Sequence, residues 1–211
     1  MDLQYPIGKF TWKRRGDGLL RLDSERKEWL ADIEETPARL WAAVTGLTEA
    51  QLDTPYRPGG WTVRQVVHHF ADSHVNAYVR FRLALTENEP TIKPYDERSW
   101  AQLADARSAP VDLSLTLLET LHQRWVILLR SLDPEDFARK LNHPELGAVT
   151  LEKYLALYAW HGKHHVAHIT GLRQRSGWKV ALPLPNRIPI RLLSAKNARS
   201  SFPSLLKSPT T

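Results

Sequence analysis

The feature that most constrains the fold of this chain is a set of four long segments in which apolar residues recur at the spacing of an α-helix. A stripe of this kind covers one face of a helix and has to be buried against another element. The segments span residues 24–47, 62–86, 111–132 and 150–177. Four helices with one stripe each bury those stripes most simply against one another. The sequence therefore predicts an all-α protein built as a four-helix bundle.

Local signals indicate where these helices begin and end. Thr62 and Gln65 have the spacing of a capping box ahead of the second helix. Gly177 is placed to end the fourth helix, whereas Pro37 lies inside the first segment and is expected to kink or divide it. A long polar link joins the second and third helices, with a short helix expected near residues 97–105. The length of this link allows a crossover connection rather than a tight hairpin.

The net charge of +6 is unevenly distributed along the 211 residues. Residues 179–211 contain six of the 29 basic residues, none of the 23 acidic residues and five of the 14 prolines. Residues 1–178 therefore hold 23 basic and 23 acidic residues and are neutral overall. We interpret residues 1–178 as the helical bundle and residues 179–211 as a basic, proline-containing, disordered tail. A neutral bundle without a nucleic-acid-binding motif argues against nucleic acid as the partner.

The composition also limits the chemistry and the compartment. The absence of cysteine excludes disulfides, thiolate zinc sites and a cysteine nucleophile, and it fits a reducing compartment. The first residues lack the basic and apolar regions of a signal peptide. No apolar run approaches the roughly 18 residues that span a bilayer. We therefore expect a cytoplasmic protein that does not bind membranes.

Seven of the nine histidines fall into two clusters, one in the second predicted helix and one in the fourth. Without cysteine, a transition-metal site would have to use imidazole and carboxylate groups. Two histidines four residues apart on a helix can both reach one ion. On a helical wheel of the fourth helix, His161 and His165 face the apolar stripe, whereas His164 and His168 are turned toward solvent.

The first cluster offers a third ligand. On its wheel His69 lies at the edge of the apolar face, His74 lies within that face, and His68 points away. Helix geometry alone therefore accepts either His69 or His74. The competing interpretation is that these histidines are hydrogen-bonded core residues, which is the more common role of a single buried histidine.

Several segments closely resemble the YfiT-type proteins of the DinB superfamily, a group labelled as metal-dependent hydrolases. The segments that carry this resemblance are YPIGKF (5–10), QLDTPYRPGGWTVRQVVHHFADSH (51–74), KPYDE (93–97), LHQRWVILLRSL (121–132) and LYAWHGKHHVAHI (157–169). The resemblance covers nearly all of the predicted bundle and none of the tail. It implies a DinB-type four-helix bundle that is often a homodimer, with a three-histidine metal site open to solvent.

The resemblance also implies which histidines are ligands. The first ligand of the family follows a tryptophan by eight residues, which here is His69 after Trp61. The other two are the outer residues of an H-x-x-x-H motif in the last helix, here His161 and His165. His74 then becomes a candidate for the pocket or for a fourth ligand.

Three neutral imidazoles with an open position are typical of a catalytic site for one divalent ion, zinc first and nickel or cobalt as alternatives. The first hypothesis is a metal-dependent hydrolase that acts on a small molecule. No general base can be assigned from the sequence. Asp72 and Glu152 are near the ligands along the chain, but their wheel positions lie outside the pocket.

Two further hypotheses remain open. Relatives in the wider superfamily imply transfer of a low-molecular-weight thiol to an electrophile. Arg57, Arg64 and Arg124 are candidates to receive the carboxylates of such a thiol, although a structural role is the more common one for each. The third hypothesis is a non-catalytic metal-binding bundle, in which His74 closes the coordination sphere.

Overall fold

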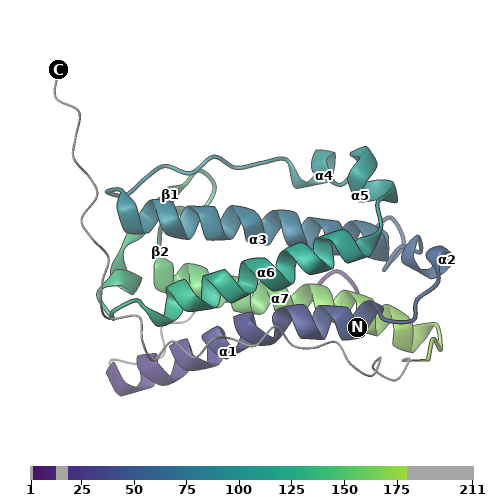
Figure 1. The fold of residues 1–211 in the computed structure, drawn as a ribbon, viewed down its shortest axis with the longest axis horizontal. Helices are drawn as coiled ribbons and strands as arrows, with labels where there is room; N and C mark the ends of the chain where they lie inside the picture. The colour runs from purple at the N-terminus through teal and green to yellow at the C-terminus, as the bar shows by residue number, and fades with distance from the viewer. Residues whose placement is uncertain (1, 13–18, 180–211) are drawn as a thin grey trace.

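Four long helices lie side by side in the computed structural model, which describes residues 2–12 and 19–179 (Figure 1). They are α1 (Leu19–Val44), α3 (Val63–Thr86), α6 (Val111–Arg130) and α7 (Leu151–Arg175). The predicted all-α four-helix bundle is therefore confirmed. The predicted tail, apart from its first residue, lies outside the described residues.

The helices α3 and α6 run in the same direction because the link between them returns along the whole length of α3 (Figure 1). At the start of the link, Thr91 forms an isolated bridge with Asn142. At its end, the Ala109 carbonyl accepts a hydrogen bond from Arg64, in the first turn of α3. The link holds two short helices, α4 (Glu97–Trp100) and α5 (Ala104–Ser108), where the sequence predicted one. The connection is a crossover of the kind seen in some four-helix bundles.

Three further short elements lie outside the bundle helices. They are α2 (Glu49–Leu52), a 3₁₀ turn η1 (Asp136–Ala138) and a hairpin of β1 (Lys140–His143) and β2 (Gly147–Thr150). The two strands are antiparallel, with Lys140 opposite Thr150. The hairpin was not predicted from the sequence, because four residues per strand are too few to establish an alternating pattern. Among the described residues, no helix combines the length and apolarity required to cross a membrane.

The helix ends agree with their sequence signals at three places. The Thr62 hydroxyl accepts from the Gln65 backbone N–H, and the Gln65 side chain accepts from the Thr62 N–H, so the predicted capping box is present. Thr150 caps α7 in a similar way, and Gly177 beyond its end has a φ of +64°. Pro37, in contrast, does not divide the first segment, because α1 continues through it as one helix.

The interior contains two apolar clusters. The cluster near the hairpin includes Ile33, Phe81, Trp125, Leu155 and Tyr158. The cluster near α2 includes Leu40, Phe70, Leu115, Leu118 and Ile169. Between them, and at the edge of the second cluster, lies a group of six histidines that we call the histidine layer: His69, His74, His122, His161, His165 and His168. Five of these histidines are buried, and only His161 in the layer is partly exposed. It lies on α7, which contacts α3 less extensively than the other neighbouring long helices contact each other.

Candidate metal centre

The structure brings the three predicted ligands together across the space between α3 and α7. His69 comes from α3, and His161 and His165 come from successive turns of α7. Each offers a ring nitrogen, and these three nitrogens all lie within 4.8 Å of one another. The two Nε2 atoms of His161 and His165 are 3.1 Å apart. His69 and His165 are buried, whereas His161 is partly exposed.

Aromatic rings surround this cluster and shape its electrostatics. The Trp61 ring packs 4.6 Å from the His69 ring, and the Phe70 ring contacts both histidines of α7. Burial, with a smaller contribution from His168, lowers the pKa of His69 to about 4. Burial also lowers the pKa values of His161 and His165 well below the usual value. All three are therefore neutral at pH 7, which is the form that binds a metal.

The donor set fits a divalent transition-metal ion. Two imidazole nitrogens bound tetrahedrally to one zinc ion stand about 3.3 Å apart, given bonds of about 2.05 Å. The 3.1 Å separation of the two Nε2 atoms of α7 is close to that value. Imidazole is a ligand that zinc, nickel and cobalt all accept. The cluster could therefore hold such an ion with limited movement of its side chains.

His74 lies behind His161 rather than beside the cluster. Its Nε2 atom is 3.2 Å from Nδ1 of His161, and its Nδ1 atom is 2.9 Å from Nε2 of His122 on α6. Both ring nitrogens therefore face other histidines, so neither is free to act as a fourth ligand. His122 was not considered in the sequence analysis. Its position on the apolar stripe of α6, between Leu118 and Trp125, is the signal that could have identified it.

The prediction that His164 and His168 turn toward solvent is wrong. His164 is 6% exposed and His168 is 4% exposed. The helical wheel considered only contacts between helices, whereas an N-terminal segment covers this side of α7. The His168 Nε2 atom is 3.0 Å from the Gln4 carbonyl oxygen, and the ring of Tyr5 lies 5.8 Å from that of His164.

His68 points away from the cluster, as the wheel predicted, but it is buried rather than exposed. Its two ring nitrogens lie 2.7 Å from the Ser114 hydroxyl and 3.1 Å from the Ala109 carbonyl oxygen. His68 therefore holds α3 against the start of α6.

The remaining candidates of the sequence analysis have partners elsewhere. Buried Arg64 pairs with Asp53 and Glu49, Arg57 donates to the Tyr56 hydroxyl, and Arg124 lies 5.6 Å from the centre of the Tyr78 ring. These contacts agree with structural roles for the three arginines.

The two carboxyl groups near the predicted ligands differ from each other. Glu152 forms an ion pair of 2.8 Å with Arg26. Asp72, one turn beyond His69, is half-buried, and this burial together with the charge of Asp105 raises the pKa of Asp72 to about 6.

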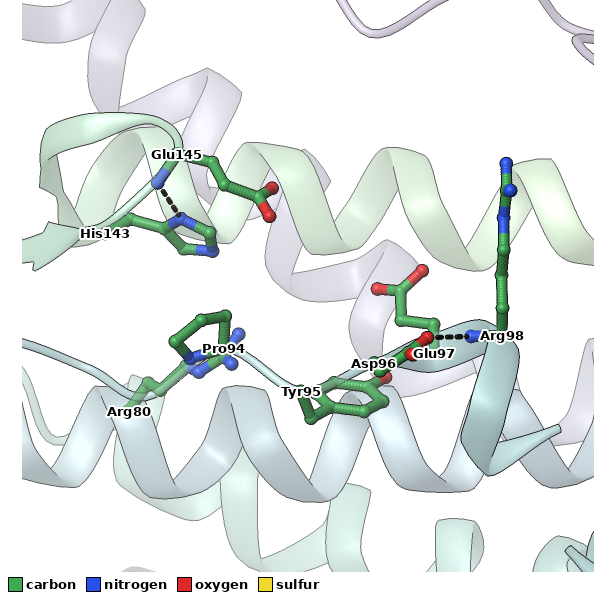
Figure 2. Close-up of a pocket in the computed structure, with 8 residues that line it drawn as sticks. All are labelled: Arg80, Pro94, Tyr95, Asp96, Glu97, Arg98, His143 and Glu145. Atoms are coloured by element: carbon green, nitrogen blue, oxygen red, sulfur yellow. Dashed lines mark hydrogen bonds between the residues drawn. The ribbon is translucent and has the colours of Figure 1, made fainter.

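A cavity of about 540 Å³ lies between α3, the link and the hairpin (Figure 2). Its volume is in the range of small-molecule sites. It is lined by Arg80, Pro94, Tyr95, Asp96, Glu97, Arg98, His143 and Glu145. Ser73 relates the cavity to the histidines, since it faces Tyr95 on one side and its hydroxyl is 3.5 Å from the Tyr158 hydroxyl on the other. The Tyr158 ring in turn packs 5.5 Å from the His161 ring.

The fold and the histidine cluster define a class of protein, a four-helix bundle with a crossover link and a three-histidine group between two of its helices. Residues 32–169 match the family model described as the DinB superfamily. The chain belongs to the DinB superfamily.

Curated relatives and a solved structure resemble most of the chain. A protein of Bacillus cereus (strain 03BB102) named "Putative metal-dependent hydrolase" is 56% identical over 178 residues, which are 84% of this chain and 99% of that protein. A protein of Bacillus thuringiensis subsp. konkukian with the same description has the same identity and coverage. YfiT from Bacillus subtilis, described as "a probable metal-dependent hydrolase with an unusual four-helix bundle topology", has a TM-score of 0.80 and 49% identity. That match covers 85% of this chain and all of YfiT.

Proposed function

We propose that this protein is a metal-dependent hydrolase that holds one divalent ion per chain on His69, His161 and His165. The observation that carries the proposal is the convergence of three imidazoles from α3 and α7, with ring nitrogens within 4.8 Å of one another. The names of the Bacillus relatives support the same function. We propose zinc as the ion and nickel as the alternative, because both accept imidazole ligands.

The substrate is a small molecule that enters beside His161, which is partly exposed, and extends toward the cavity of Figure 2. A divalent ion on three neutral imidazoles supplies Lewis-acid chemistry to the substrate. Hydrolysis also needs a group that accepts a proton near neutral pH. The pKa of Asp72, raised to about 6 by burial and by Asp105, suits this role. Its charge acts on Tyr95 of the cavity rather than on the histidines, so we propose that Asp72 accepts a proton from the part of the substrate that lies toward the cavity. The sequence placed Asp72 near the ligands along the chain but outside the pocket, and Asp105 approaches it only through the fold of the link.

Transfer of a low-molecular-weight thiol to an electrophile is the second candidate function. Arg98 lines the cavity beside Asp96, Glu97 and Glu145, and it offers pairing to a carboxylate of such a thiol. Arg80 also lines the cavity, but its two terminal nitrogens already donate to the Tyr154 hydroxyl and the Lys93 carbonyl. The chain contains no cysteine that would compete with the thiol for the ion.

The metal content per chain tests the proposed site. We expect one ion per chain in the native protein and a loss of binding in His69→Ala, His161→Ala and His165→Ala. His143→Ala is the control, because His143 lies in the hairpin and outside the cluster. A native protein that takes up no added zinc or nickel would overturn the proposal, and the histidines would then be structural.

Activity of the zinc-loaded protein separates the candidate functions. Esters and amides test hydrolysis, and a small thiol offered with an electrophile tests transfer. We expect Asp72→Asn to lower hydrolysis by about 10²- to 10⁴-fold, the usual contribution of a general base. Asp112→Asn, at an exposed position in the first turn of α6, is the matched control. Stoichiometric metal without either activity would instead support a non-catalytic metal-binding bundle.

We also propose that the protein forms a homodimer through the outer face of α6. Leu113, Leu117 and Ile127 on this helix are 65%, 46% and 56% exposed, which is unusual for large apolar side chains that lie together. Light scattering should give the mass of two chains for the native protein and of one chain for Leu113→Lys combined with Leu117→Lys. A native protein with the mass of one chain would contradict this proposal.

A further inference from the structure

We propose that two imidazole relays, each anchored on a backbone carbonyl, fix the proton positions of His161 and His165 so that both Nε2 lone pairs point into the metal centre. His74 and His122 form the relay behind His161, and His168 forms the relay behind His165. These three are positioning residues, since they act through the ligands. The inference rests on the proposed metal site, but it concerns the proton positions of the metal-free protein and can be tested there.

The first relay begins at the Ile33 carbonyl of α1. In a regular helix this oxygen would accept from the N–H of residue 37, but Pro37 has none. The Nδ1 atom of His122 lies 2.6 Å from the free Ile33 oxygen. Because a carbonyl can only accept, Nδ1 of His122 carries the proton. In the neutral ring, Nε2 of His122 is then an acceptor.

The remaining protons of this relay follow in sequence. The His122 Nε2 acceptor faces His74 Nδ1 at 2.9 Å, so His74 donates from Nδ1 and its own Nε2 becomes an acceptor. That acceptor faces His161 Nδ1 at 3.2 Å, so His161 donates from Nδ1. The Nε2 atom of His161 is left with a lone pair.

The second relay reaches the same result from the N-terminal segment. His168 Nε2 lies 3.0 Å from the Gln4 carbonyl oxygen and therefore donates to it. Its Nδ1 is then an acceptor and faces His165 Nδ1 at 3.3 Å. His165 donates from Nδ1 and keeps a lone pair on Nε2.

The two relays therefore place two lone pairs 3.1 Å apart, with no proton between them. A proton on either Nε2 atom would reverse a relay and turn a ring lone pair toward the carbonyl oxygen of Ile33 or Gln4. In the metal-free protein the two Nε2 lone pairs repel each other. A bound cation that accepts both lone pairs would remove this repulsion. The neutral rings assumed here agree with burial, which lowers the pKa of His122 to about 4 and that of His74 well below its usual value.

Long-range ¹⁵N–¹H spectra of the metal-free native protein test the proton positions directly. We expect His74, His122, His161 and His165 to carry the proton on Nδ1 and His168 to carry it on Nε2. A proton on Nε2 of His161 or His165 would overturn the inference. If the expected tautomers are found but no metal binds, the relays stand and the proposed function fails. If metal binds to a protein with the reversed tautomers, the relays fail and the function stands.

Two variants test the effect on the metal site. His122→Leu and His168→Leu should each weaken zinc binding by about 10- to 100-fold, as loss of a group that orients a ligand usually does. In His122→Leu only the His161 proton should no longer be confined to Nδ1. In His168→Leu the same should hold only for the His165 proton. Unchanged zinc affinity in both variants would overturn the inference, and if either fails to fold, the spectra of the native protein decide.

The matched control is His68→Leu. His68 is buried at 6% exposure on the same helix as His69, but its ring nitrogens face Ser114 and the Ala109 carbonyl instead of the relays. We expect it to lower thermal stability and to leave zinc affinity and both ligand tautomers unchanged. A loss of affinity equal to that of the relay variants would mean that any buried imidazole has this effect, which would contradict a specific relay.

Discussion

The two apolar clusters and the histidine layer between them are built on the same four helices but are stabilised in different ways. In the clusters, side chains such as Phe81 and Leu155 gain free energy by leaving water, whatever their partners. In the histidine layer every buried ring nitrogen costs free energy unless it has a partner. The clusters can therefore tolerate changes of shape, whereas the layer depends on a specific chain of proton positions.

The largest expected effect concerns a cluster and leaves the layer unchanged. Phe81→Ala should lower the free energy of unfolding by about 3–5 kcal/mol, because it removes a fully buried ring and leaves a cavity. Urea unfolding of the metal-free protein measures this loss. The folded fraction should still bind one zinc ion, and a loss of zinc binding would show that the layer depends on the packing of the cluster.

Acidification should affect the layer and not the clusters. The pKa of His122 is lowered by burial from 6.5 to about 4, so the folded metal-free protein resists a proton that the unfolded chain accepts. The stabilising contribution of His122 is full above pH 6.5, and this contribution alone should fall by about 3 kcal/mol as the pH drops from 6.5 to 4. Urea unfolding at several pH values checks this, with His122→Leu as the control that should lose this part of the dependence. An identical pH dependence in both proteins would contradict the prediction.

Zinc binding should raise the stability of the folded protein through the histidine layer and not through the apolar clusters. A ligand at 100 times its dissociation constant stabilises the folded state by about 2.7 kcal/mol, and chelation should remove that gain. Thermal unfolding with and without zinc measures it. The gain should persist in Phe81→Ala and vanish in His165→Ala, whereas a gain in both would place the ion elsewhere.

The smallest effect is expected at Pro37, where α1 meets the layer. Pro37→Ala restores an N–H that competes with His122 for the Ile33 carbonyl. Since a carbonyl has two lone pairs, we expect the zinc-binding free energy to change by less than about 1 kcal/mol. Calorimetric titration with zinc measures it. A change as large as that of His122→Leu would mean that the free carbonyl controls the whole relay.

Much of the fold could be predicted because its signals are local. The capping box of Thr62 and the helical stripes depend only on residues a few positions apart, and both are present. Of the two outcomes expected at Pro37, a kink or a division, the division does not occur, because α1 packs along α6 and α7, and such tertiary packing can outweigh a local helix-breaking signal. The burial of His164 and His168 was missed for a similar reason, since Gln4 and Tyr5, which cover them, are distant in the sequence.

The sequence by itself determined the four helices, the inward side of α7 that carries His161 and His165, and a chain without cysteine ligands. The tertiary structure alone decided that His69 meets them, that His74 and His122 stand behind one ligand, and that His168 stands behind the other. The physical reason is range. Helical periodicity depends on residues that are close together in the sequence. The position of a proton on an imidazole depends on the atom that faces the ring, and here the relays end at the carbonyl oxygens of Ile33 and Gln4, which are distant in the sequence.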